Sequence, residues 1–536
     1  MTDPLGKRST RGYDRAGNLL RLVEPKGRAT RMEYDRLDRL VKVTDPLGGV
    51  VHRLLDAVGN LVGVVDQNGN QTSYEYDAAN RVKAEVYADG SRLEWDWDLA
   101  GNLLVQRDPR GFVTGFEHDA LDRLVRLTYT DEPEATFAYD ANSNLVERRD
   151  GTGTYTFEHD PEDRVSAFTQ PTGSRYRVQH DGEGNRTAFF FPDGSCQALT
   201  YDPSGRLSQM RTPDGRRTTF HYDAEGLRTR IDRPNGTRTL YEYDLARRLS
   251  RVAHLAADGS KVTPDFRLTR DALGNVLNVK DEDSPLWTYG YDDLDRLVQA
   301  VDHVRGTTSQ WAYDAVGNRL SETVDGATTL SRYNVLNQLV QMGATRFWYD
   351  RAGNLTRQAG PGSVTGYRFD SRDRLVQVHT PSNQHVHYTY DAVGRMQTRR
   401  LGTETRPTRL EWDGWDLARE VAPNGLETTY HVPEGEILAI KRGSSLYQVH
   451  ADALGSVRTV TDSTGANVAS FDFDVWGGLV ASSGSLSSAV SAKFVGSLGT
   501  KWDVDTGLVY MRHRWYDDTF SAFLSKDPEV VSDRAI

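Results

Sequence analysis

The sequence predicts an all-β protein in which tandem β-hairpin repeats coil into a hollow spiral shell, a cocoon. Three observations predict this fold. An aromatic residue followed by Asp recurs about every 21 residues, and each unit between two such marks contains two turn sequences. The residue types A, V, I, L, M, F, W, Y and C make up 37% of the chain, and the mean hydropathy is −0.62. This composition is too polar for a thick apolar core.

The recurring mark, an aromatic residue or His followed by Asp, defines the repeat unit, with Leu55 and Arg270 in the aromatic place before Asp56 and Asp271. The first seven marks follow one another at intervals of 21 residues, and later intervals stay near that value. Twenty marks at one period exceed chance, which establishes a repeat array before any domain is counted. The marks fall at Asp14, Asp35, Asp56, Asp77, Asp98, Asp119, Asp140, Asp160, Asp181, Asp202, Asp223, Asp244, Asp271, Asp292, Asp314, Asn334, Asp350, Asp370, Asp391 and Asp413.

Each unit has the composition of a β-hairpin. A first turn reads aromatic-Asp-x-x-Gly-Asn-Leu, as at 13–19, and a second reads Asp-Pro-x-Gly, as at 45–48. Asp caps its own backbone two residues on, Gly and Asn accept positive φ, and Pro presets φ. Between the turns lie segments of about seven residues, rich in Leu, Val, Tyr, Phe and Thr, which is the composition of strands. Two turns in each unit leave two strands, so the unit is a hairpin.

The array is too long to stay flat. Gly, Pro or Asn interrupts nearly every window of helical length, so no helix is expected. Twenty hairpins give about forty strands, which would extend roughly 190 Å at ~4.8 Å per strand. Because open twisted sheets seldom exceed about ten strands without curling, the ribbon is expected to coil around a partly polar interior.

The repeated aromatic and Asp residues are better explained by structure than by ligands. An aromatic at one fixed place in each hairpin predicts a cross-strand ladder rather than a platform for sugars or bases. The Asp residues lack the dense carboxylate spacing of a calcium loop, so turn capping is the better explanation. No cofactor and no metal site are expected.

Charge and composition exclude several classes of protein. The chain carries 65 basic and 76 acidic residues, a net charge of −11, with no long cationic run, which argues against nucleic-acid binding by the shell itself. Cys196 is the single cysteine, so neither an intramolecular disulfide nor a multi-cysteine metal site is expected. There is no stretch of membrane-spanning length and no signal peptide. Export would therefore use a signal outside this chain or a dedicated secretion machine.

The two ends of the chain depart from the regular repeat. Asp3-Pro4-Leu5-Gly6 stands where the second turn of a hairpin belongs, so the chain is expected to open in mid-hairpin, with an edge that another segment or partner covers. Toward the other end the repeat weakens, and 482–491 is a Ser-rich insertion. We therefore divide the chain into a repeat shell at 1–413 and a degenerate segment at 414–536.

The degenerate segment carries the most specific motifs. They are Asp452-Ala453-Leu454-Gly455-Ser456-Val457-Arg458, then 507–517, which reads Gly-Leu-Val-Tyr-Met-Arg-His-Arg-Trp-Tyr-Asp, and finally 523–528, which reads Phe-Leu-Ser-Lys-Asp-Pro. Together with the marks, these motifs resemble the YD repeats and repeat-associated core of the Rhs family. That family includes bacterial polymorphic toxins, C subunits of Tc toxin complexes, wall-associated proteins and teneurins.

The resemblance implies a function and three site residues. In bacterial members of the family, a β-cocoon encloses a toxic C-terminal domain, and the core is an intramolecular aspartyl protease that releases it. By position, the protease residues would be Arg514, Asp517 and Asp527. Two neighbouring carboxyl groups do not both ionise, so one holds a proton while the other activates water. The family's Gly-Arg between the two Asp residues is replaced here by 518–522, and its Pro-x-Gly-Leu after Asp527 is absent. The segment is therefore expected to stop before the cleavage junction.

The resulting hypothesis is the shell of an Rhs- or Tc-type toxin. Its expected partners are a C-terminal toxin domain as cargo, an N-terminal plug or a B-type shell that covers the open edge, and a component of a secretion system. The protein would be made in the bacterial cytoplasm and then delivered. The alternative is a wall-associated or teneurin-like protein that recognises glycans or a partner at a cell surface. A free-standing hydrolase ranks last, because no HExxH, GxSxG or P-loop motif is present.

Overall fold

The computed structural model describes residues 1–527, and it confirms the predicted all-β repeat fold. A sheet of 46 strands is joined by a separate sheet of four strands. In the long sheet each strand pairs antiparallel with the next strand in sequence, as β1 with β2 and β45 with β46. Within the described residues, no helix is long and apolar enough to cross a membrane.

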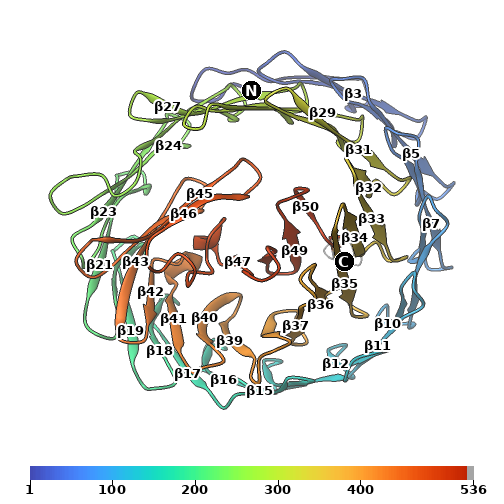
Figure 1. Cartoon of the computed structure of the whole chain (residues 1–536). Helices are drawn as coiled ribbons and strands as arrows, with labels where there is room; N and C mark the ends of the chain where they lie inside the picture. The colour runs from blue at the N-terminus through green and yellow to red at the C-terminus, as the bar shows by residue number, and fades with distance from the viewer. Residues whose placement is uncertain (528–536) are drawn as a thin grey trace.

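The long sheet coils through two revolutions (Figure 1). The first revolution contains β1 (Thr10–Tyr13), β2 (Leu19–Val23), β3 (Ala29–Tyr34), β4 (Leu40–Thr44), β5 (Val50–Leu55), β6 (Leu61–Val65), β7 (Gln71–Tyr76), β8 (Val82–Val86), β9 (Arg92–Trp97), β10 (Leu103–Arg107), β11 (Val113–His118), β12 (Leu124–Tyr129), β13 (Ala135–Tyr139), β14 (Leu145–Asp150), β15 (Gly153–His159), β16 (Val165–Thr169), β17 (Arg175–His180), β18 (Arg186–Phe190), β19 (Cys196–Tyr201), β20 (Leu207–Arg211), β21 (Arg217–Tyr222), β22 (Arg228–Asp232), β23 (Arg238–Tyr243) and β24 (Leu249–Leu255).

The second revolution starts at the rim of the ring in Figure 1 and lies inside the ring toward its end. It contains β25 (Phe266–Arg270), β26 (Val276–Asp281), β27 (Ser284–Tyr291), β28 (Leu297–Asp302), β29 (Thr307–Tyr313), β30 (Arg319–Val324), β31 (Ala327–Tyr333), β32 (Leu339–Met342), β33 (Thr345–Tyr349), β34 (Leu355–Gly360), β35 (Ser363–Phe369), β36 (Leu375–His379), β37 (His385–Tyr390), β38 (Met396–Leu401), β39 (Thr408–Asp413), β40 (Asp416–Val421), β41 (Glu427–His431), β42 (Ala439–Arg442), β43 (Ser445–Ala451), β44 (Val457–Thr461), β45 (Asn467–Phe473) and β46 (Leu479–Ser483).

The rest of the chain lies in the middle of the ring (Figure 1). The long sheet runs without a break past Asp413, and the division there by repeat regularity stays a prediction. The short elements are the 3-10 helices η1 (Pro433–Gly435) and η2 (Gly496–Leu498) and the strands β47 (Lys501–Trp502), β48 (Val509–Met511), β49 (Arg514–Asp517) and β50 (Ala522–Phe523).

The Asp of each mark caps the turn that follows it. Asp14 Oδ1 accepts the backbone N–H groups of Ala16 at 2.9 Å and of Asn18 at 2.8 Å. Gly17 takes φ 95° there, a conformation that glycine adopts without steric cost. The predicted turn capping is confirmed, and among the described residues no group of three or more His, Cys, Asp or Glu could hold a metal ion.

Most of the repeat Tyr and Trp side chains are tied to the preceding hairpin through their polar atom. Tyr76 Oη donates to the carbonyl of Leu61 at 2.9 Å, and Trp97 Nε1 donates to the carbonyl of Val82 at the same distance. Successive repeat aromatics are two strands apart, about 10 Å, which exceeds the stacking range of two rings. The expected ring-on-ring ladder is therefore replaced by hydroxyl–carbonyl bonds and by Arg side chains over the rings, as Arg123 over Tyr139 at 4.8 Å.

Neighbouring turns are joined by side chains of two alternating kinds. Where the turn ends in Asn, as at Asn18, its Nδ2 donates to Asp38 of the next turn at 2.7 Å. Where it ends in Arg, as at Arg39, the guanidinium donates to the carbonyl of Asp56 at 2.8 Å. The structural repeat is thus a pair of hairpins. A turn that ends in Asn donates to an Asp side chain of the next turn, and that turn ends in Arg and donates to a backbone carbonyl of the turn after it.

Contacts between the revolutions form a seam, and the sequence separation across it shrinks along the chain. Arg28 bonds Asp295 at 2.7 Å across 267 residues, whereas Asn235 bonds Thr461 at 2.9 Å across 226. His254 Nε2 donates to the carbonyl of Ala451 at 2.9 Å across only 197 residues. The second revolution is therefore shorter than the first, and the spiral tightens toward its C-terminal end.

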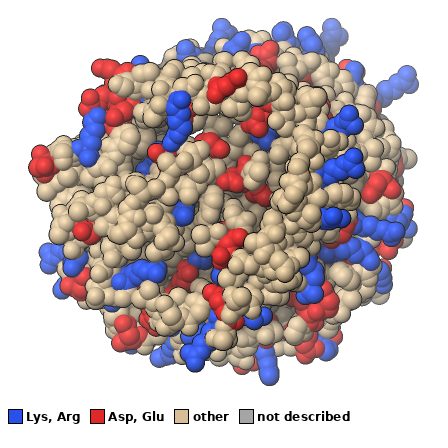
Figure 2. Space-filling model, viewed as in Figure 1, with Lys and Arg blue, Asp and Glu red and all other residues tan. Residues whose placement is uncertain are grey.

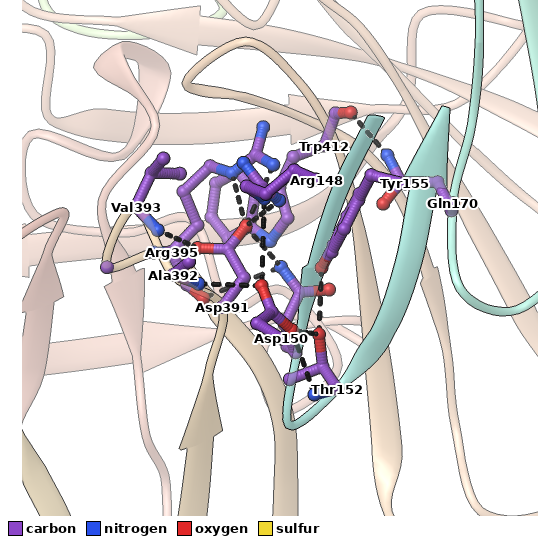
Figure 3. A network of polar contacts seen from close by, with 12 residues as sticks. Arg148, Asp150, Thr152, Tyr155, Gln170, Asp391, Ala392, Val393, Arg395 and Trp412 are labelled. Atoms are coloured by element: carbon purple, nitrogen blue, oxygen red, sulfur yellow. Dashed lines mark hydrogen bonds and ion pairs between the residues drawn. The ribbon is translucent and has the colours of Figure 1, made fainter. Parts of the chain in front are cut away.

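One part of the seam is a buried ionic network (Figure 3). Arg148 donates to Asp391 Oδ2 at 2.9 Å, and Arg395 donates to the same oxygen at 2.8 Å. Asp150 accepts the backbone N–H of Ala392 at 2.8 Å. Arg148 and Asp391 are 3% and 1% exposed. Because water does not reach these charges, the ion pairs must compensate the cost of desolvation.

The shell is thin-walled. Its accessible surface is 25733 Å² for a mass of 60.1 kDa, whereas a compact monomer of that mass exposes roughly 19,000 Å². Figure 2 shows this face hollowed near its centre, with acidic side chains around the hollow. The largest apolar cluster fills the narrow end, where β32–β45 meet the C-terminal strands. The predicted hollow spiral is thereby confirmed.

Candidate active site

The candidate site lies on the four-stranded sheet inside the shell. β49 is its third strand and pairs with β48, through Tyr510 and Trp515, and with β50, through Tyr516 and Phe523. Sharp connections with positive φ at Arg512 (60°) precede β49 and at Ser521 (56°) follow it. The site residues are therefore held on short strands between tight turns.

The strand is anchored to the second revolution. Trp515 Nε1 donates to Tyr390 Oη at 2.8 Å. Beyond β50, the backbone N–H of Leu524 donates to the carbonyl of Trp515 at 2.9 Å, and the carbonyl of Leu524 accepts from Leu355 at 2.8 Å. These bonds fix the path of the chain that leads to Asp527.

The structure brings two of the three predicted residues together. Arg514 and Asp527 form an ion pair at 2.8 Å. The guanidinium of Arg514 also lies 3.7 Å from the centre of the Phe523 ring. The side chain of Asp527 is 43% exposed and reaches a cavity of about 640 Å³.

Asp517 lies on the opposite face of β49, because side chains alternate along a strand. It is 6% exposed, and its Oδ1 accepts the backbone N–H of Thr519 at 2.9 Å. Burial raises the pKa of its carboxyl group, which favours the protonated form. The roles assigned to Arg514, Asp517 and Asp527 stay predictions.

A further acidic residue was not singled out in the sequence. Burial, followed by the charges of Asp517 and Asp474, raises the pKa of Asp518 to about 6. Burial likewise raises the pKa of Asp474. The only sequence signal for Asp518 is its position beside Asp517, in the segment that replaces the family's Gly-Arg.

The cavity beside Asp527 is lined by three parts of the chain. Tyr87 and Phe116 come from the first revolution, Arg372 from the second, and His513 and Lys526 from the C-terminal strands. Lys526 Nζ lies 3.7 Å from the centre of the Tyr87 ring, and burial lowers the pKa of its ammonium group. The expected loss of Pro-x-Gly-Leu and of the cleavage junction concerns 528–536, which lie outside the described residues.

Comparisons with known proteins agree with this architecture. The sequence profile of the teneurin YD-shell matches 113–267 and 257–535, and that of the RHS repeat matches 13–50 and 56–92. The chain is 27% identical to double-stranded DNA deaminase toxin A of Burkholderia cenocepacia over 48% of its length. It is 29% identical to probable deoxyribonuclease RhsA of Dickeya dadantii over 53%. The chain spans about a fifth of the length of each of these relatives.

Solved structures show the same fold. A crystal structure of TcdB2-TccC3 superposes with a TM-score of 0.79 at 16% identity, over 98% of this chain and 34% of that chain. The Tc holotoxin pore of Photorhabdus luminescens also gives 0.79 at 16% identity, over 97% and 32%. With the profile matches and the repeat geometry, these findings place the protein in the Rhs/YD-repeat family, the family of the teneurin YD-shell.

Proposed function

We propose that the chain forms the shell of a bacterial Rhs- or Tc-type toxin and encloses a C-terminal toxic domain. The observation that carries this proposal is the thin wall of the closed spiral, whose accessible surface of 25733 Å² exceeds by about a third the value for a compact monomer. A second support is the length of the relatives, of which this chain matches about a fifth. The remainder leaves room for a plug, a partner shell and a toxin.

The shell has two further partners in this proposal. An N-terminal plug or a B-type shell covers the edge strand β1, because an unpaired strand edge is prone to pair with other chains. A specialised secretion system delivers the complex after it is made in the bacterial cytoplasm. The toxin-type relatives support this placement.

Enclosure is tested by fusing a small epitope-tagged domain after Ile536. We expect the folded fusion to bind an antibody against the epitope poorly and to bind it fully after denaturation, because an enclosed epitope lies behind the wall of the shell until the shell unfolds. The same domain fused before Met1 is the matched control and binds equally in both states. Full binding at the C-terminal fusion in the folded state would contradict enclosure.

The same chain carries a self-cleaving site at Arg514, Asp517 and Asp527. Asp517, whose pKa burial raises, donates a proton to the leaving amine. Asp527 accepts a proton from the water that attacks the scissile carbonyl, and Arg514 stabilises the oxyanion that forms. The products are a new carboxyl end and a new amino end. The cavity beside Asp527 receives the segment that is cut.

Self-cleavage is tested by extending the chain with a family-type C-terminal junction and measuring the product masses. We expect the parent to be cut and Asp527→Asn and Asp517→Asn to be cut at least about a hundredfold more slowly, the usual effect of removing an acid–base group. Asp283→Asn, in an exposed hairpin turn, is the control and keeps the parent rate. Equal cleavage of the parent and Asp527→Asn would remove Asp527 from the site.

The alternative is a wall-associated or teneurin-like binding protein. The match to the teneurin YD-shell profile favours it, although that profile describes the shell and not its ligand. Antibody access to the fused C-terminal domain distinguishes the two, because a binding protein has no need to enclose a cargo.

A further inference from the structure

Eight consecutive strands of the second revolution contain no acidic residue. From β31 to β38 the strand sequences have neither Asp nor Glu, although the whole chain is acidic by 11 charges. The same strands carry Arg332, Arg346, Arg357, Arg368, His379, His385, His387, Arg399 and Arg400.

The register places most of these cations on one face of the sheet. Cross-strand partners share a face, and Trp348 pairs with Arg357, Arg368 with Gln377, and Gln377 with His387. The series continues from His387 to Arg400. At ~4.8 Å per strand, the row extends over roughly 35–40 Å. We call this surface the arginine face, defined by Arg332, Arg346, Arg357, Arg368 and Arg400.

The arginine face looks outward. The opposite face of the same strands carries Phe347 and Tyr388, whose rings lie 5.1 Å from Phe520 and 4.4 Å from Trp515. The strands β49 and β50, which contain Trp515 and flank Phe520, lie in the middle of the ring (Figure 1). Arg332, Arg346, Arg357 and Arg368 are exposed, and Arg400 is half-buried.

The cations of the arginine face lack carboxylate partners within residues 1–527. On the outer face of the first revolution, by contrast, several exposed cations are neutralised by carboxylates on neighbouring strands. Arg126 bonds Glu117 at 3.0 Å, and Arg175 bonds Glu158 at 2.8 Å. Between β31 and β38 the outward cations are spaced along the sheet without such pairs, so their charge is directed to the solvent.

Exposed apolar side chains are mixed with these cations. Trp348 is 41% exposed, Leu330 66% and Val364 47%, and the register places all three on the arginine face. Tryptophan and arginine are enriched in the energetic centres of protein interfaces. Arginine also presents a planar fork of donors that matches a carboxylate. A row of this length spans an interface of ordinary size.

We infer that the arginine face is a docking surface for a protein that presents a row of carboxylates. Nucleic acids and anionic lipids also carry negative charge, but exposed Leu330 and Val364 contribute nothing to phosphate binding. A convex wall also lacks the groove that tracks a nucleic-acid backbone. The docked protein would cover the outside of the shell at its narrow end and leave the candidate active site inside untouched.

The test measures binding of a Glu-rich peptide to the whole chain by fluorescence anisotropy. We expect the triple variant Arg346→Glu, Arg357→Glu, Arg368→Glu to bind at least about tenfold more weakly, and Trp348→Ala to bind several-fold more weakly. The triple Arg→Lys variant at the same positions keeps the charge but loses the fork, and we expect it to fall between the parent and the Glu variant. Unchanged thermal melts of the variants establish that the shell is intact.

Two controls make the result decisive. Arg126→Glu changes charge on the same outer surface where the cation is already paired, and we expect it to leave peptide binding within about twofold. A duplex DNA oligonucleotide and phosphatidylglycerol vesicles are measured in parallel. Preferential binding of either one, equal effects of Arg126→Glu and the triple variant, or no peptide binding at all would overturn the inference.

Discussion

Replacing Asp391 with asparagine should lower the free energy of unfolding by about 3–5 kcal/mol, the usual effect of breaking a buried ion pair on one side. Arg148 and Arg395 both donate to Asp391 Oδ2, and the substitution leaves two buried guanidinium groups without their shared anion. Asparagine keeps the turn cap, because its carbonyl oxygen still accepts the backbone N–H of Arg395 that Asp391 Oδ1 accepts at 2.9 Å. The loss therefore reports on the seam and not on the turn.

Urea unfolding followed by circular dichroism measures this loss. Asp98→Asn is the matched control, since Asp98 caps its turn through the backbone N–H of Asn102 at 2.8 Å but lies in the first revolution without a seam contact. A small change at Asp98 with a large change at Asp391 is expected. Equal changes at both positions would assign the effect to turn capping and would contradict a role for the ionic network.

Acidification from pH 7 to pH 5 should weaken the shell through three buried histidines at the seam. His254 Nε2 donates to the carbonyl of Ala451 at 2.9 Å, its Nδ1 is hydrogen-bonded to Thr239 Oγ1 at 2.8 Å, and its ring lies edge-on to that of His450 at 5.0 Å. His431 contacts Gln197 of the first revolution at 2.8 Å. Burial lowers the pKa of His254 to about 3, that of His431 to about 4, and that of His450 well below its usual value.

The direction of the effect follows from the lowered pKa values. In the folded shell these imidazoles stay neutral, whereas in the unfolded chain they take up protons below about pH 6.5. Their contribution to stability is therefore complete above pH 6.5 and is lost as the pH falls. Each histidine contributes a loss of about 2 kcal/mol at pH 5. Turn carboxylates such as Asp98, whose pKa is lowered, titrate at lower pH. Buried carboxyl groups with a raised pKa, such as Asp518 at about 6, act in the opposite direction, but they are the same in the parent and in a histidine variant, so a comparison of the two isolates the histidine.

The measurement is the urea midpoint of the parent and of His254→Asn at pH 7 and at pH 5. We expect the variant to be less stable than the parent at pH 7 but to lose less on acidification, because one titrating group is gone. His52→Asn, on an exposed position of β5, is the control and keeps the parent's pH dependence. An identical pH dependence in His254→Asn would show that protonation of His254 on unfolding does not contribute to the loss of stability at pH 5.

The local structure was predictable because it is encoded within each repeat. The Asp14 turn and the Gly17 conformation follow from residues within five positions of each other, and such short-range chemistry is visible in a single sequence. The alternation of Asn and Arg at the end of successive turns, as at Asn18 and Arg39, is also present in the sequence and corresponds to the two kinds of contact between turns. It appears only when pairs of units, rather than single units, are compared.

The seam and the candidate site were less accessible to sequence reasoning. Arg28 meets Asp295 across 267 residues, and no local pattern specifies which repeat faces which after a full revolution. Likewise, Arg514 was expected beside both carboxyl groups, and the structure pairs it with Asp527 while strand alternation directs Asp517 to the buried side of β49. The docking of β49 on the second revolution decides these positions, and that docking depends on the curvature of the whole sheet.

The shrinking separation across the seam has a consequence for how the length of the array can change. Within one revolution a hairpin contacts only its neighbours, so adding a unit costs little locally. Every seam contact, however, joins residues separated by a defined number of residues, from 267 at Arg28 to 197 at His254. Inserting one hairpin between Arg148 and Asp391 would lengthen the 243 residues that separate this buried cation from its anion and would mismatch every other contact that spans the insertion. The seam therefore fixes the number of hairpins between contacting residues. Related shells should gain or lose hairpins in the first revolution only when the second revolution gains or loses hairpins as well.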